Sequence, residues 1–150
     1  MTGQFVALIR ASSSVQGYIY TSCCNGAPVK EMWSRRPQSG DQYCTGGAVS
    51  GQVCGWTVDW VAGNYYYTDS GETARNVTHG TKRQQCQLHG DSGGPVYTVR
   101  SDGGISAKGI ISGEWIHDSY VDWYELYSCE NVFTDIWDAY WGLPGWLVTS

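Results

Sequence analysis

Short strand-like runs, separated by glycine-containing turns, set the strongest constraint on how this chain folds. Compact or alternating apolar runs of this length are typical of β-strands. They cover residues 5–9, 17–21, 52–61, 64–67, 95–99 and 106–112. The turns between them include Thr45-Gly46-Gly47, Asp69-Ser70-Gly71 and Ser101-Asp102-Gly103-Gly104. Several short strands at this spacing predict an all-β barrel or sandwich.

Two other stretches depart from this pattern. Residues 23–41 are polar and irregular and contain two prolines and an arginine pair, which is typical of a linker or a long surface loop. Residues 132–140 fall near a 3.6-residue period, Asn131 or Thr134 can cap a helix there, and Gly142 and Pro144 end the pattern. We therefore expect one short helix near the C-terminus.

Charge and hydropathy argue against two kinds of partner. The net charge of -5 is modest and spread along the chain, so no basic patch points to nucleic acid. The apolar run 5–9 is too short for a membrane span or for the core of a signal peptide. We expect neither a nucleic-acid nor a membrane partner.

The cysteine pattern bears on cofactors and compartment. None of the six cysteines lies in a CxxC arrangement, so a zinc site is disfavoured and we expect no metal or cofactor. An even number in a glycine-rich chain predicts disulfides, an oxidising compartment and hence a secreted protein. Because a disulfide-rich chain without an export signal is unusual, we expect this chain to be part of a longer product.

The hexamer Gly90-Asp91-Ser92-Gly93-Gly94-Pro95 has the composition that an activated serine needs. Such a serine requires a tight turn that exposes its hydroxyl, backbone N–H groups for the developing oxyanion, and a base. The glycines of the hexamer allow both the tight turn and the exposed N–H groups, so we favour an activated serine over an ordinary glycine turn. The same letters fit the nucleophile elbow of α/β-hydrolases, but a turn and a strand follow Ser92 where that fold needs a helix. We therefore expect Ser92 to be a nucleophile outside the α/β-hydrolase fold.

The hexamer resembles the active-serine motif of chymotrypsin-like serine proteases, and in particular their bacterial α-lytic protease and streptogrisin branch. Further similarities extend over nearly the whole chain. Cys86 lies six residues before Ser92, and Cys44 and Cys54 are ten residues apart around Ser50-Gly51. The stretch 109–113 is similar to the family's substrate-binding strand, which ends in Ser-Gly, and a cysteine and a terminal helix follow it.

The resemblance implies a fold and a division of the chain. Residues 1–42 would be remnant strands of a first barrel with the interdomain loop. Residues 43–150 would be the C-terminal antiparallel β-barrel with a short terminal helix.

The resemblance also implies a serine endopeptidase that cleaves a polypeptide substrate through an acyl-enzyme. Ser92 would be the nucleophile, and the N–H groups of Gly90 and Ser92 would form the oxyanion hole. The substrate would contact His89, Ser112, Gly113 and Glu114. The implied disulfides are Cys44–Cys54 and Cys86–Cys129.

The chain has no residue that matches the family's base or the acid partner of that base. The family places both before the serine, and Phe5 stands where the acid is expected. His79, in a polar stretch, His89 and His117 each fit a surface or pocket-rim position better than the base. Since triad members act as a unit, the chain alone is expected to be nearly inert. A missing N-terminal barrel or a second chain would supply the histidine.

Two substitutions separate the chain from the family's site. The carboxylate at Asp91 is expected to pair with a cation, but Thr45 replaces the arginine that the bacterial branch uses. The candidate cations are Arg35, Arg36 and Arg83. Glu114 replaces a glycine at the mouth of the substrate pocket, where it would either favour a basic side chain or obstruct the pocket. Gln87 and Leu88 beside it carry no charge.

Two other readings of the whole chain stay open. One is a catalytically inert, protease-like binding module, and the other is a half-barrel that assembles with copies of itself or with a partner to cover exposed strand edges. Cys23 and Cys24 are expected to pair with a missing segment or another chain. The tryptophans between 115 and 146 are expected to pack the helix onto the barrel rather than form a sugar- or partner-binding surface. Asn76-Val77-Thr78 is a glycosylation sequon.

Overall fold

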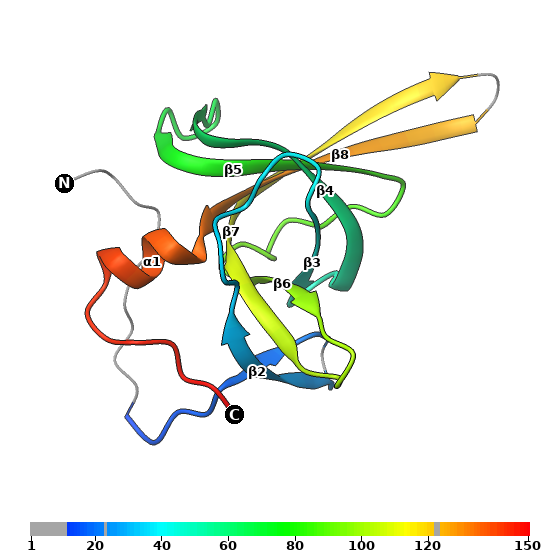
Figure 1. Cartoon of the computed structure of the whole chain (residues 1–150). Coiled ribbons are helices and arrows are strands. Elements are labelled where there is room, and N and C mark those ends of the chain that lie inside the picture. Colours follow the sequence, from blue (N-terminus) through cyan, green and yellow to red (C-terminus); the bar gives the residue numbers. More distant parts are fainter. Residues whose placement is uncertain (1–11, 23, 122–123) are drawn as a thin grey trace.

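The computed structural model describes residues 12–22, 24–121 and 124–150, with the backbone alone for 116–121 and 124–127. These residues form eight strands and one helix (Figure 1). The elements are β1 (Tyr18–Tyr20), β2 (Gly26–Met32), β3 (Gln42–Gly47), β4 (Gly51–Tyr66), β5 (Thr73–Arg83), β6 (Pro95–Val99), β7 (Ile105–Val121), β8 (Tyr124–Asp135) and α1 (Ile136–Gly142). The prediction of an all-β fold with one short C-terminal helix is confirmed.

Six of the strands close into a ring. The order β7-β6-β3-β4-β5-β8 is antiparallel throughout, and a further antiparallel pairing of β8 with β7 completes it. The outer part of the β7–β8 hairpin extends beyond the ring, and α1 lies on its flank (Figure 1). Closure leaves the six strands without an open sheet edge over the paired lengths.

The interior of the ring is filled by aromatic and branched side chains that alternate along the strands. Tyr43 stacks on Trp56 and meets Phe133 edge-on, with ring centroids 6.0 and 5.1 Å apart. Trp56 is fully buried, and its indole N–H donates to Thr45 Oγ1 at 3.1 Å. The remaining members of this cluster are Val53, Val58, Val96, Ile111 and Cys129. Burial of these side chains is the main driving force for closing the ring.

A second layer covers one side of the ring. β1 pairs with β2, and β2 pairs in parallel with β7. Val29 of β2, Tyr97 of β6 and Ile136 of α1 share a buried cluster between this layer and the ring. The C-terminal tail joins it, because the N–H of Ser150 donates to Val29 O at 2.9 Å.

Four local predictions were wrong. The predicted turn at Thr45-Gly46-Gly47 is the end of strand β3, and the turn to β4 follows at 48–50. Residues 23–41 are not entirely loop, because 26–32 form β2 and gain ladder partners from both β1 and β7. His79 lies in strand β5, not in a polar loop, and is 6% exposed. The helix begins at Ile136 because Asp135, not Asn131 or Thr134, caps it by accepting the N–H of Trp137. Residues 131–135 instead complete β8.

The C-terminal aromatics divide into two groups. Trp137 is half-buried and packs α1 against the cluster around Val29, as expected. Trp115 is also half-buried, but it packs against a cluster of strand residues, Ala74, Val77 and Val132, that contains no helix residue. Trp141 and Trp146 are 73% and 81% exposed and therefore do not pack the helix onto the ring. The sequon residue Asn76 donates its side-chain amide to Asp138 at 2.7 Å, so the fold already uses this amide to join β5 to α1.

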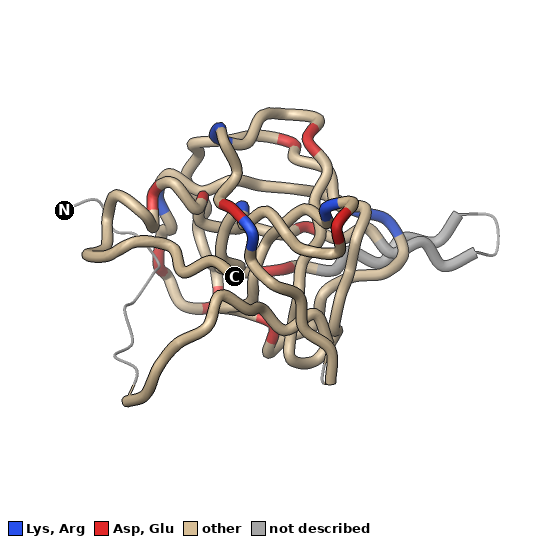
Figure 2. The backbone as a smooth tube through the Cα atoms, turned by 60° about the horizontal axis from the view of Figure 1, so that its bottom comes forward, with Lys and Arg blue, Asp and Glu red and all other residues tan. Residues whose placement is uncertain are grey.

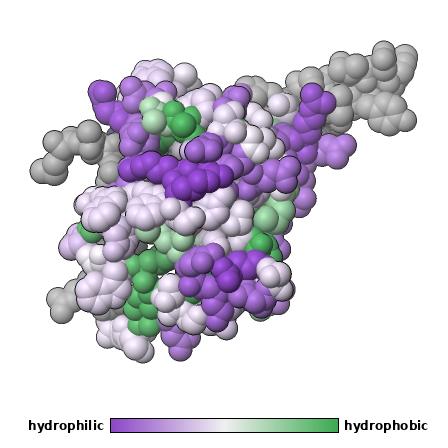
Figure 3. Space-filling model, in the orientation of Figure 1, coloured by the Kyte–Doolittle hydropathy of each residue, from purple (hydrophilic) through white to green (hydrophobic). Residues whose placement is uncertain are grey.

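Surface charge and hydropathy are both dispersed. Figure 2 shows acidic and basic residues interspersed along the backbone. On the face seen in Figure 3, apolar surface is broken into separate patches among polar residues. In the described part of the chain, no helix has the length and apolarity that crossing a membrane requires.

Candidate functional site

Ser92 lies on the loop that joins β5 to β6, the nucleophile loop (residues 84–94). Its start is tied to β8 by the disulfide between Cys86 and Cys129. Within it, the N–H of Asp91 donates to Leu88 O at 3.1 Å and that of Gly94 donates to Asp91 O at 3.0 Å. Ser92 is exposed at the tip of the loop thus formed. This is the accessible position that a nucleophile needs.

Two glycines of the loop have structural reasons to be glycine. Gly90 has φ +106°, in the region where side chains with a Cβ are strained. A Cβ on Gly94 would lie 2.1 Å from the carbonyl oxygen of Gly46 in β3, so only glycine lets the loop approach this strand. The glycine pattern in the sequence is therefore explained by backbone geometry before any chemistry is invoked.

The backbone N–H groups around Ser92 fall into two sets. That of Gly93 donates to Ile111 O at 2.9 Å, and Ile111 returns its own N–H to Gly94 O at the same distance. This exchange fastens the loop to β7. Across the described segments, the N–H groups of Gly90 and Ser92 donate to no backbone acceptor. They are the pair expected for the oxyanion hole, and that role stays a prediction.

Asp91 is held by backbone N–H groups, and it forms no ion pair with any cation of the described segments. One carboxylate oxygen accepts from Val49 and Ser50 at 2.8 and 3.1 Å, and the other accepts from Leu88 at 3.0 Å. Burial raises the pKa of Asp91, but hydrogen bonds from Ser50, Leu88 and Val49 outweigh burial and hold the pKa below its ordinary value.

The expected cation partner of Asp91 is thereby replaced. Two of the candidates bind other carboxylates: Arg35 pairs with Asp41 at 2.7 Å, and Arg36 pairs with Asp135 and Asp138 at 2.8 Å each. The β3–β4 turn at Val49 and Ser50 supplies the hydrogen bonds that a cation was expected to supply.

Replacement of Asp91 by asparagine is expected to destabilise the fold by about 2 kcal/mol or more, because N–H donors then face an amide NH₂. In the wild type, the stabilisation from Asp91 is complete above its ordinary pKa and is lost as the pH falls through the lowered pKa. Denaturant unfolding against pH measures both effects. Asp69→Asn, in an exposed turn, is the matched control; equal losses in the two variants would contradict the role of Asp91.

The two substrate-binding residues of β7 lie beside the nucleophile loop. One edge of β7 pairs with β8, and this pairing continues through Gly113. The other edge pairs with β6 only up to Ile110, and the nucleophile loop hydrogen-bonds to Ile111 there. The other edge of β7 at Ser112 and Gly113 therefore has no paired strand among the described segments. The Ser112 hydroxyl contacts that of Thr134 at 3.3 Å. Ser112 is partly exposed and Gly113 is buried, and we call this unpaired stretch the open edge of β7. A strand edge without a paired strand next to an exposed serine can hold an extended peptide by backbone hydrogen bonds.

A buried polar chain underlies this edge. The hydroxyl of Tyr43 donates to Asn131 Oδ1 at 3.1 Å, and Asn131 Nδ2 donates to Gln87 Oε1 at 2.7 Å and to Gly113 O at 3.4 Å. Gln87 and Asn131 are 1% and 0% exposed. The sequence did not predict Tyr43 or Asn131 as residues of the site, because neither lies near Ser92 in the chain. The pairing of β8 with β7 brings Asn131 to the site.

Glu114 follows Gly113 and is partly buried. Burial raises the pKa of its carboxyl group, the charge of Asp91 raises it further, and His89 lowers it. Leu88 and His89 are both exposed on the nucleophile loop. The substrate-facing role of His89 and Glu114 stays a prediction.

Among the described side chains, no histidine provides a buried base next to Ser92. His79 is stacked on Trp60 and lies 3.4 Å from Asp59 and 3.3 Å from Glu130, in contacts that involve β4, β5 and β8. His117 lies in β7 opposite Ser128, and its side chain falls outside the described residues. Phe5, at the expected acid position, and the strand prediction for 5–9 also lie outside them.

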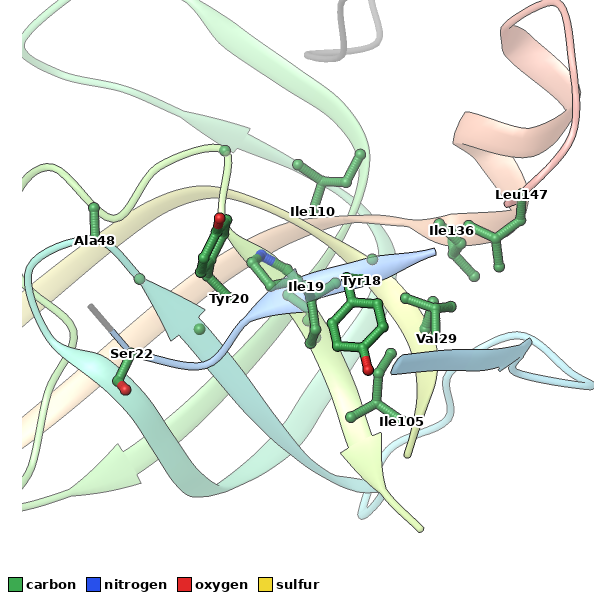
Figure 4. Close-up of a pocket in the computed structure, with 18 residues that line it drawn as sticks. Tyr18, Ile19, Tyr20, Ser22, Val29, Ala48, Ile105, Ile110, Ile136 and Leu147 are labelled. Carbon is green, nitrogen blue, oxygen red and sulfur yellow. The ribbon is translucent and has the colours of Figure 1, made fainter. Parts of the chain in front are cut away.

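An apolar cavity of about 690 Å³ lies on the other side of the nucleophile loop. Gly93, Gly94 and Pro95 form its wall next to Ser92. Figure 4 shows Tyr18, Ile19 and Tyr20 of β1 and residues of β2, β7, α1 and the C-terminal tail around it. Tyr18 and Tyr20 are 57% and 78% exposed at its rim. The cavity thus places apolar surface against the side of the loop.

Both disulfides that the resemblance implied are present, Cys44–Cys54 between paired residues of β3 and β4 and Cys86–Cys129. Their presence is compatible with an extracellular protein. Cys24 is exposed, and Cys23 lies outside the described residues. Among the residues that the structure describes, no group of three or more metal-ligating side chains could hold a metal ion.

No protein-family model matches the chain, and no curated protein matches it in sequence.

Proposed function

We propose that this chain is the nucleophile-bearing part of a serine endopeptidase with a chymotrypsin-like C-terminal barrel. The observation that carries the proposal is an exposed Ser92 on a loop in which the backbone N–H groups of Gly90 and Ser92 donate to no described backbone acceptor. Few other roles need both an exposed hydroxyl and a preorganised anion site in one tight turn. The closed antiparallel ring around Tyr43, Trp56 and Phe133 is compatible with this assignment.

In the proposed reaction, the substrate peptide lies along the open edge of β7 at Ser112 and Gly113. Ser92 Oγ attacks the scissile carbonyl carbon and loses its proton to a base, and the carbonyl oxygen becomes an oxyanion that accepts from the N–H groups of Gly90 and Ser92. Collapse of this intermediate breaks the C–N bond, the amine leaves with the proton from the base, and water then hydrolyses the acyl-enzyme by the same steps.

The base in this proposal is a histidine that an N-terminal barrel or a second chain would supply, because the undescribed residues 1–11, 23 and 122–123 contain none. His79 is engaged in the Asp59 and Glu130 contacts, and His89 is exposed on the loop. The apolar cavity at Gly93–Pro95 is the surface on which that barrel or chain would pack, since it adjoins Ser92 and is walled by apolar side chains. Secretion fits the two disulfides.

A fluorophosphonate tests the nucleophile directly, because it modifies activated serines. We expect selective modification at Ser92, found by peptide mass mapping, and a faster reaction when added imidazole substitutes for the missing base. Ser92→Ala abolishes this modification. Ser101→Ala, a matched change in an exposed turn, leaves it intact. Modification of Ser101 as fast as that of Ser92 would refute the proposal.

The second candidate is an inert binding module built on the same fold. The observation that favours it is the position of His79, the buried histidine among the described side chains, which packs against Trp60 instead of serving Ser92. Under this alternative, imidazole has no effect on the reactivity of Ser92, so the same experiment separates the two functions.

A further inference from the structure

Glu114 lies where three parts of the site meet. It follows the open edge of β7 directly, and it pairs across the ladder with Asn131 of β8. Residues directly opposite each other in an antiparallel pair project to the same face, so both side chains lie on one side of the sheet. Asn131 in turn donates to Gln87 of the nucleophile loop. Glu114 is thus placed beside the loop that carries Ser92.

Two polar atoms at this junction are buried without a partner. Glu114 Oε2 and Gln87 Nε2 have no hydrogen-bond partner in the described part of the chain, although Gln87 is only 1% exposed. Buried polar groups in native structures almost always have partners, so each such atom needs an explanation. A carboxylate oxygen accepts hydrogen bonds only, and its missing partner is therefore a donor.

The charge around Glu114 specifies what kind of donor this is. The titratable groups that act on it are Asp91, His89 and Tyr67. Asp91 repels the carboxylate, and its own oxygens already accept three backbone N–H groups. Neither Tyr67 nor Asp91 carries positive charge, and His89 is exposed. The site therefore holds more negative than positive charge, which a cationic donor offsets.

We propose that Glu114 makes this site selective for arginine or lysine as the side chain on the peptide residue that Ser92 attacks. The inference rests on the proposed function for the position of the peptide and goes beyond it in assigning the substrate class. An arginine or lysine supplies N–H donors and the missing charge together. A neutral amide side chain supplies donors alone, and an apolar one leaves Glu114 Oε2 unpaired.

Binding of a matched pair of small ligands tests this without any turnover. Nα-acetyl-arginine N-methylamide and its citrulline analogue have the same shape and differ in charge. In ¹H–¹⁵N NMR titrations that follow the backbone N–H of Gly113, we expect the arginine ligand to bind at least about tenfold more tightly than citrulline. Glu114→Gln should remove the difference. Glu72→Gln, which makes the same charge change in an exposed position, should preserve it.

Glu114→Gln is expected to fold, since it removes a buried carboxylate without a partner. Equal affinities of wild-type protein for the two ligands, no binding of either, or an arginine preference that survives Glu114→Gln would each overturn the inference. The same titrations on Ser92→Ala separate it from the proposed function. An arginine preference there, with no fluorophosphonate reaction in wild-type protein, would leave the cation site standing and remove the protease chemistry.

Discussion

Replacement of Lys108 by methionine is expected to remove a rise in stability that the wild-type protein shows between neutral and alkaline pH. Lys108 is fully buried in β7, with its ammonium 3.0 Å from the centroid of the Trp33 ring and 2.9 Å from Gln42 O. Burial lowers its pKa from 10.5 to about 7; Asp41 opposes this shift and Arg35 adds to it.

The direction in which stability changes with pH follows from whether the folded or the unfolded chain binds the Lys108 proton. Between the folded pKa of about 7 and the unfolded value of 10.5, the unfolded chain holds a proton that the folded chain has lost, so stability increases with pH. The full difference corresponds to about 5 kcal/mol, and about 3 kcal/mol of it falls between about pH 7 and about pH 9.5. Below pH 7 both states are charged, and the cost of burying the ammonium is present in full.

Urea unfolding followed by tryptophan fluorescence at fixed ionic strength measures this slope. This pH range ends below the ordinary pKa of tyrosine, so buried Tyr43 stays neutral throughout the measurement. Lys108→Met should lie above wild type at pH 7 and show a flat profile. Lys30→Met, at an exposed lysine, should keep the wild-type slope. A wild-type profile that is flat over this range would contradict the expected loss of the proton.

Local sequence patterns predicted the strands that are bounded by turns. The run 95–99 coincides with β6, and 52–61 lies within β4, because alternation and flanking glycines mark both. The long β5 and β8 and the shorter β2 and β3 were not predicted. Polar and apolar residues are mixed in these segments without a clear strand pattern. They are strands because β5 pairs with β8, β2 pairs with β7 and β3 pairs with β4. Tertiary pairing decided their structure, and local propensity did not.

The candidate site likewise has a part that local sequence predicts and a part that only tertiary contacts determine. The loop around Ser92 could be predicted because its glycines answer a local backbone requirement, as at Gly90. The partners of Asp91 could not, because backbone N–H groups leave no signature in a sequence and the predicted partner was therefore a charged side chain. Asn131 was missed for a related reason, since 44 residues of chain separate it from the Gln87 that it contacts.

Removal of the Cys86–Cys129 disulfide is expected to cost more stability than removal of Cys44–Cys54. The first closes a loop of 43 residues and the second a loop of 10. In the chain-entropy description, the cross-links restrict the unfolded state by about 4 and about 3 kcal/mol respectively. Cys44 and Cys54 are also neighbours across the β3–β4 ladder, whose hydrogen bonds hold these strands together without the cross-link.

The two disulfides should also differ in their effect on Ser92. Cys86 lies near the start of the nucleophile loop, and Cys129 is fully buried in the core cluster that also contains Trp56 and Phe133. Their bond therefore fixes the loop to the ring. The double variant C86A/C129A should therefore lose stability and slow the fluorophosphonate reaction at Ser92, while C44A/C54A slows it less. Denaturant unfolding and mass mapping on the same samples test both. An equal reaction rate in the two variants at a temperature where both are folded would show that the hydrogen bonds of Gly93 and Gly94 to Ile111 hold the loop in place unaided.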